Sequence, residues 1–149
     1  MNQGTRYNRL AKDLEMGLED SYAIPYLMLQ YGSKALIPLV KGLQCPTMKM
    51  RVNCVLCLQK LGDQKAVDAL IQMFDDIDNE HFSGEITETL KQLCRWKSLN
   101  PIIIALHTGS PRIREKIARL LEDYKDETIL PELIKALKDP VLDVFIKIC

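Results

Sequence analysis

The chain has 149 residues, of which 47% are hydrophobic and 27% are charged, as is ordinary for a globular domain. Twenty lysine and arginine residues balance twenty aspartate and glutamate residues, so there is no basic excess to neutralise a phosphate backbone, and nucleic-acid binding is disfavoured. No apolar run approaches the roughly 20 residues that span a bilayer, and the first residues lack the apolar core of a signal peptide.

Apolar residues recur about every 31 positions along the chain, in two registers. One register contains Leu39, Leu70, Ile102 and Leu133, and the other contains Met50, Phe82, Ile113 and Val144. A period of this length is typical of repeat proteins, in which each unit buries its apolar face by stacking on its neighbours. Within each unit the apolar residues follow the i, i+3, i+4, i+7 spacing of a helix. Each unit is therefore predicted to be a pair of helices.

The predicted pairs cover approximately residues 5–31, 33–61, 64–94, 98–124 and an incomplete 127–149, in a single domain spanning 1–149. The first pair is irregular, as expected of a terminal unit that must solvate its outer face. Gly32 and Gly62 are predicted to end second helices in the left-handed conformation, and Ser33 and Asp63 to cap the helices that follow. The last helix begins near Val144 and stops at Cys149. That open end is expected either to be a truncation or to pack on a partner, such as a second copy of the chain.

The second helices of these pairs resemble a known family. Residues 50–63 read MRVNCVLCLQKLGD, and they are similar to the second helix of the short HEAT repeats that also occur in phycobilisome lyases. Residues 113–121 repeat the pattern, and residues 82–90 are a degenerate copy without its arginine. The resemblance covers roughly residues 20–149 and implies an all-α fold, a right-handed α-solenoid of stacked antiparallel pairs with about 31 residues each. It says little about function, because such arrays serve many binding roles.

Several residues allow both a chemical and a structural interpretation. Arg51 and Arg114 occupy the repeat arginine position, where a guanidinium clamps an anion or, as we favour, donates to an aspartate or to carbonyls at a turn between units. Trp96, flanked by two cations, is either an exposed binding anchor or a plug at a repeat junction, and the sequence leaves these two readings equal.

The cysteines and histidines do not form a recognisable metal or catalytic motif. Cys54 and Cys57 form a C-x-x-C, but both fall at small-residue positions of the helical repeat, so core packing is favoured over zinc or redox chemistry. The five cysteines lie mostly at core positions, which favours reduced thiols and a cytoplasmic location. Glu80 and His81 form a single acid–histidine pair, and His107 stands apart, so neither a metal nor another cofactor is expected. No nucleophile–base arrangement or phosphate loop is present, so the sequence does not indicate an enzyme.

The remaining candidate is the concave face, which the variable positions of the second helices would line. Its predicted binding residues are Val52, Asn53, Leu56, Gln59, Glu85, Glu88, Gln92, Glu115, Lys116 and Arg119. Val52 and Leu56 are apolar where a solvated face would be polar, and an acidic and then a basic ridge follow them. This order suits a peptide or a helix better than a phosphate backbone. A neutral solvated face with two incidental aliphatic residues is the equally weighted alternative.

The sequence therefore favours a non-enzymatic scaffold that binds a protein or peptide on its concave face. A lyase-like helper that positions a chromophore is the alternative that the family resemblance implies. A HEAT-like DNA glycosylase is disfavoured, because it would need a basic concave face.

Overall fold

A computed structural model of the chain describes residues 2–17, 22–94, 99–123 and 131. Within these ranges all regular structure is helical, without a strand, so the prediction of an all-α chain is confirmed. The chain forms two compact units, residues 1–96 and residues 97–149. None of the described helices has both the length and the apolar composition that a membrane span requires.

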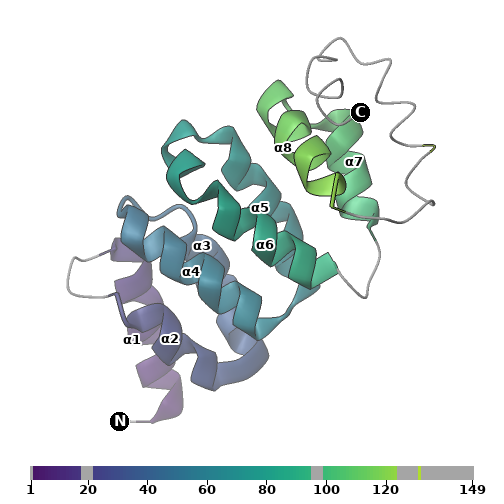
Figure 1. The fold of residues 1–149 in the computed structure, drawn as a ribbon. Helices are drawn as coiled ribbons and strands as arrows, with labels where there is room; N and C mark the ends of the chain where they lie inside the picture. The colour runs from purple at the N-terminus through teal and green to yellow at the C-terminus, as the bar shows by residue number, and fades with distance from the viewer. Residues whose placement is uncertain (1, 18–21, 95–98, 124–130, 132–149) are drawn as a thin grey trace. The chain divides into compact units, whose positions relative to one another are not determined.

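The first unit contains helices in two layers, with short 3₁₀ segments where the chain turns (Figure 1). The α-helices are α1 (Gln3–Met16), α2 (Ile24–Met28), α3 (Leu36–Gly42), α4 (Met48–Leu61), α5 (Val67–Gln72) and α6 (Ser83–Cys94). The 3₁₀ segments are η2 (Leu29–Ala35), η3 (Gln64–Ala66), η4 (Met73–Asp75) and η5 (Ile77–Phe82). Helix α4 packs on both α2 and α6, while α1 contacts α2 and α3, α3 contacts α4, and α5 contacts α6.

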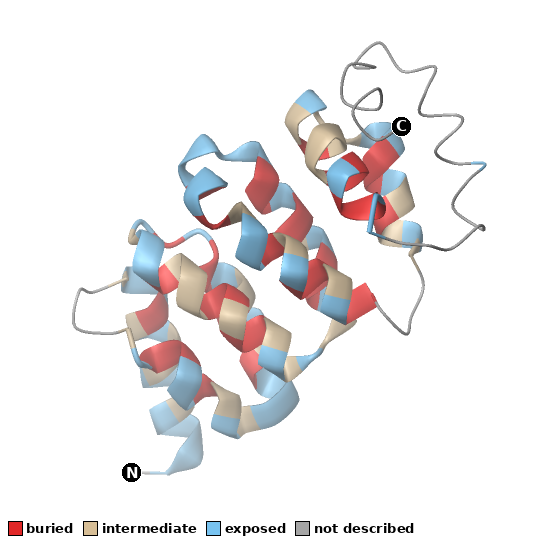
Figure 2. Cartoon of the chain, in the orientation of Figure 1, coloured by how far each residue is buried: buried red, intermediate tan, exposed pale blue. Residues whose placement is uncertain are grey.

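The apolar residues that recur in the sequence form the core between the layers of the first unit (Figure 2). The largest fully buried side chains there are Leu14, Met28, Leu39, Met50, Leu58, Leu70, Ile71, Phe74, Ile86 and Leu90. Successive helices thus bury one face each while the opposite face stays exposed, which leaves the solvent faces of α2, α4 and α6 available for function.

Glycines end two of the helices in the first unit. Gly17 and Gly62 follow α1 and α4 with φ angles of 59° and 71° in the left-handed region, and Asp63 caps η3 by accepting from the Lys65 N–H at 3.0 Å. Gly32 departs from the expected left-handed cap, because its φ of 58° is combined with a ψ of −131° inside η2. That combination is open almost only to glycine, so the residue turns the chain from α2 into α3. Ser33 does not cap α3, whose N-cap position is Ala35.

Gly42 sets the packing distance of α3. A Cβ atom on Gly42 would collide with the Cys54 Sγ and would stand only 2.8 Å from Leu14 Cδ2. Helix α3 therefore approaches α1 and α4 more closely than a larger residue would allow.

The second unit contains α7 (Asn100–Thr108) and α8 (Pro111–Leu121), which pack against each other. Ser110 caps α8, its hydroxyl oxygen accepting from the Ile113 N–H at 3.3 Å, and Pro111 follows in the first turn, where its missing N–H costs little. The buried residues of this pair are Ile102, Ala105, Leu106, Ile113, Ile117, Ala118, Leu120 and Leu121. The predicted incomplete pair 127–149 lies outside the described residues apart from Pro131, so its contact with a second copy stays a prediction.

Candidate functional site

The predicted binding residues of the first unit lie on what we call the α2–α4–α6 face, the surface formed by these three adjacent helices. Val52 and Leu56 on α4 are half-buried. Asn53 on the same helix contacts the segment before α2, and Gln59 contacts α6. Because successive residues of a helix are rotated by about 100°, positions 52 and 56 fall between those two sides. The two aliphatic side chains therefore occupy the centre of the face.

Aromatic rings and lysines border this centre on the α2 side. The Lys49 ammonium lies 4.3 Å from the centroid of the Tyr22 ring, and the Lys60 ammonium lies 5.2 Å from that of Tyr26. Asn53 Nδ2 donates to the Tyr22 carbonyl at 2.9 Å. Cation–π contacts hold the lysines over the rings without neutralising their charge, so this border is apolar and positive at once.

Acidic side chains border the centre on the α6 side. Glu85, Glu88 and Gln92 are exposed on α6. Gln92 Nε2 donates to Glu88 Oε1 at 3.3 Å, and neither carboxylate forms an ion pair within the part of the chain that the structure describes. The Thr89 hydroxyl contacts Gln59 Oε1 at 3.3 Å and so joins α6 to α4. The face therefore runs from positive through apolar to negative.

The remaining predicted binding residues belong to the second unit. Glu115 and Lys116 on α8 are half-buried, and Arg119 is exposed. The Arg119 guanidinium donates to Glu115 at 2.9 Å, one helical turn away. The predicted basic ridge thus contains a local ion pair. Trp96 lies outside the described residues, so its role stays a prediction. The acidic ridge belongs to the first unit and the basic ridge to the second, so the prediction that one ridge follows the other on a single face also stays a prediction.

Arg51 makes contacts at the turns that join neighbouring helices. Its Nη1 donates to the carbonyls of Cys45 and Pro46 at 2.8 and 3.1 Å, and its Nε donates to Asn79 Oδ1 at 3.0 Å. The buried Asn79 in turn donates to the Met73 carbonyl at 2.9 Å. The guanidinium therefore ties the turn before α4 to the turn before α6. Its counterpart Arg114 lies half-buried on α8.

The four cysteine thiols that the structure describes are buried and free. Cys45, Cys54, Cys57 and Cys94 form no disulfide. Burial raises the pKa of Cys54 strongly, and it raises the pKa values of Cys57 and Cys94 to about 12 and about 11. Thiols with such pKa values stay protonated near neutral pH, so they are poor nucleophiles and poor metal ligands.

Metal-binding geometry is missing from the described ranges. No group of three histidine, cysteine, aspartate or glutamate side chains comes together there. Glu80, His81 and His107 are all exposed.

Two features of the first unit are not predictable from the repeat pattern of the sequence. One is the pairing of Tyr22 and Tyr26 with lysines of α4, which joins residues far apart in the chain. The other is a pocket between α1 and η2, described below. A larger hollow of about 580 Å³ is lined by Arg51, by the carboxylates of Asp76 and Asp78, and by apolar and amide side chains of α3, α5 and the turns before α4 and α6.

The described residues define an all-helical protein in which consecutive helices form pairs and the even-numbered helices of the first unit share one face. A family model described as the PBS lyase HEAT-like repeat matches residues 50–76, the stretch from α4 through η4. The chain thus carries a HEAT-like repeat at residues 50–76, and the resemblance predicted from residues 50–63 is confirmed there. The copies at residues 82–90 and 113–121 lie outside the match and stay predictions. No curated protein and no solved structure matches the chain.

Proposed function

We propose that this protein is a non-enzymatic interaction module, a right-handed solenoid of HEAT-like pairs of about 31 residues that binds a protein segment on the α2–α4–α6 face. The observation that carries the proposal is the pair Val52 and Leu56, apolar and only half-buried, between a positive and a negative border. Buried free thiols suit work in a reducing compartment such as the cytoplasm.

The apolar centre supplies the affinity in this proposal. Covering a partly exposed valine and leucine removes apolar area from water at about 25 cal/mol per Å². Tyr26 is still 39% exposed and Leu27 is 42% exposed, so both can extend the anchor toward α2. A few such side chains commonly carry most of the binding free energy of an interface.

The charged borders supply the orientation. Lys49 and Lys60 attract an acidic residue of the partner on the α2 side, and Glu85 and Glu88 attract a basic one on the α6 side. The expected partner is therefore a segment with a central apolar residue, an acidic residue on one flank and a lysine or arginine on the other. Reversing that order would place like charges opposite each other, which costs affinity.

Selection from a random peptide library on the immobilised full-length chain tests this proposal. The selected peptides should share the acidic–apolar–basic order and should lose at least about tenfold in affinity, about 1.4 kcal/mol, for Leu56→Glu. Glu88→Lys should shift the preference toward acidic residues at the basic flank. Ile37→Glu is the matched control, because Ile37 is 65% exposed on α3 and lies outside the face.

Retained affinity in Leu56→Glu, with helicity unchanged by circular dichroism, would show that the α2–α4–α6 face is not the binding surface. Selected peptides that share a central apolar residue but no order of charges would support the apolar anchor and contradict the proposed orientation. A coloured adduct formed with a bilin would support the lyase-like role instead.

A further inference from the structure

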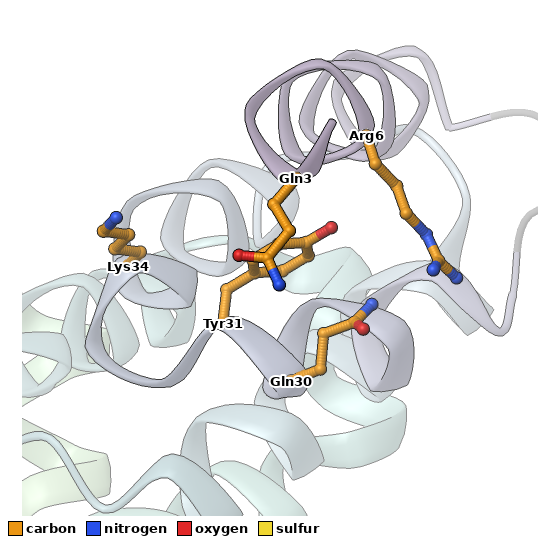
Figure 3. Close-up of a pocket in the computed structure, with 5 residues that line it drawn as sticks. All are labelled: Gln3, Arg6, Gln30, Tyr31 and Lys34. Atoms are coloured by element: carbon orange, nitrogen blue, oxygen red, sulfur yellow. The ribbon is translucent and has the colours of Figure 1, made fainter. Parts of the chain in front are cut away.

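A second site lies beside the first turn of α1, and its lining shares no residue with those that the proposed function uses. Gln3 and Arg6 from α1 and Gln30, Tyr31 and Lys34 from η2 line a pocket of about 330 Å³. Figure 3 shows Arg6 and Lys34 at opposite ends, with Gln3 and Tyr31 between them and Gln30 below Arg6. The lining is entirely polar apart from the tyrosine ring.

The pocket carries two positive charges and no carboxylate in its lining. The side chains of Arg6 and Lys34 are exposed, and neither forms a hydrogen bond or an ion pair with any residue that the structure describes. Gln30 Nε2 donates to the Leu27 carbonyl at 2.9 Å, which fixes that amide at the wall. The hydrogen-bond donors of Arg6, Lys34 and Gln3 are thus free for a ligand that accepts hydrogen bonds.

The two walls are held together before any ligand binds. The Tyr7 hydroxyl of α1 donates to the Lys34 carbonyl at 2.8 Å, and the Tyr7 and Tyr31 rings meet edge to face with centroids 5.3 Å apart. The unusual φ/ψ of Gly32 sets the turn between Tyr31 and Lys34. A pocket that is already formed pays less of the ordering cost of binding.

We propose that this pocket binds a phosphate monoester. A phosphate monoester carries a charge of about −1.5 to −2 near neutral pH and offers three acceptor oxygens, which matches two cations and the neighbouring amide donors. The Arg6 guanidinium can donate two parallel N–H groups to it. The pocket also lies at the N-terminal end of a 14-residue helix, where the helix dipole favours an anion. A carboxylate or a phosphodiester carries a single negative charge and leaves one of the two cations unneutralised.

Titration of the full-length chain with methyl phosphate, followed by amide NMR shifts, tests the assignment. The amides of Gln3 to Arg6 and of Gln30 to Lys34 should shift together and saturate. Dimethyl phosphate and acetate, both monoanions, should bind at least about tenfold more weakly. Arg6→Gln should weaken the binding of methyl phosphate about tenfold or more, and Lys34→Gln should weaken it severalfold.

The matched control is Arg9→Gln, which removes the same charge from an exposed arginine of α1 that does not line the pocket. It should change the affinity less than twofold. Equal weakening by Arg6→Gln and Arg9→Gln would show a diffuse charge effect and overturn the site, as would shifts that fail to saturate. Equal binding of dimethyl phosphate would overturn the monoester assignment. A phosphoserine peptide that binds more tightly than methyl phosphate through the same amides would identify a protein as the source of the phosphate.

Discussion

Arg51 connects two turns that lie far apart in the chain, and its removal leaves several polar groups without donors. Replacing it by lysine keeps the charge but loses the planar fork that reaches Asn79 and the Cys45 carbonyl together. We expect Arg51→Lys to lower the free energy of unfolding by about 1–3 kcal/mol, since a buried acceptor left unsatisfied costs that much. Urea denaturation followed by circular dichroism measures the loss. Arg9→Lys, at an exposed position, should stay within about 0.5 kcal/mol of the parent, and an equal effect of the two variants would contradict the structural role of Arg51.

The buried thiols of α4 make stability depend on pH in the alkaline range. Their pKa values lie above the ordinary value of 9.0 in the folded chain, with Cys57 at about 12. The unfolded state therefore releases these protons first, and the stabilisation that is complete below pH 9 is lost as the pH rises from 9 toward 12. The free energy of unfolding should fall by up to about 1.4 kcal/mol per pH unit for each thiol. The double variant Cys54→Ala/Cys57→Ala should flatten that slope between pH 8.5 and 10, and an unchanged slope would show that these thiols are not protonated preferentially in the native state.

The packing of α3 depends on the small size of Gly42. A comparison of alanine substitutions at Gly42 and Gly84 tests this dependence. Gly42→Ala should destabilise the chain by about 1–3 kcal/mol, because the new methyl group collides with Cys54 and Leu14. Gly84→Ala in α6 has open space around the new atom and should stabilise by about 0.5–1 kcal/mol through helix propensity alone. Thermal unfolding of both variants measures the opposite signs. Adding Cys54→Ala to Gly42→Ala should recover part of the loss, and purely additive effects would mean that the two positions are not in contact.

The elements that follow the repeat register were predictable from sequence, and those that depend on distant contacts were not. The period of α4 indicates its buried residues because one helix face repeats every three to four positions. The partnership of Arg51 with Asn79 joins residues 28 positions apart, and nothing in the local pattern selects Asn79 as its acceptor. The pocket beside α1 lies in the first, irregular pair, where the repeat gives no register. The centre of the candidate face was predictable from two aliphatic residues at polar positions, whereas its tyrosine–lysine border was not.

At the scale of the whole molecule, residues 1–96 have a core of their own, which predicts independent folding of that part. Helices α1 to α6 bury Leu14, Met50, Phe74 and Leu90 among themselves. A fragment of residues 1–96 should therefore show dispersed amide NMR signals and a cooperative thermal transition. The amide signals of its pocket residues should also shift on addition of methyl phosphate, as in the full chain, since the pocket lies within the fragment.

A fragment that ends at Gly62 provides the control, because it removes α5 and α6 and uncovers the side of α4 that packs on α6. Since most helical stability comes from tertiary packing of an apolar face, that shorter fragment should lose cooperative unfolding and aggregate or bind hydrophobic dyes. A cooperative transition in the fragment of residues 1–62 would mean that the first two pairs suffice for folding, and that the contact between α4 and α6 serves the binding face and not the core. A disordered fragment of residues 1–96 would mean instead that the first unit requires the second for stability.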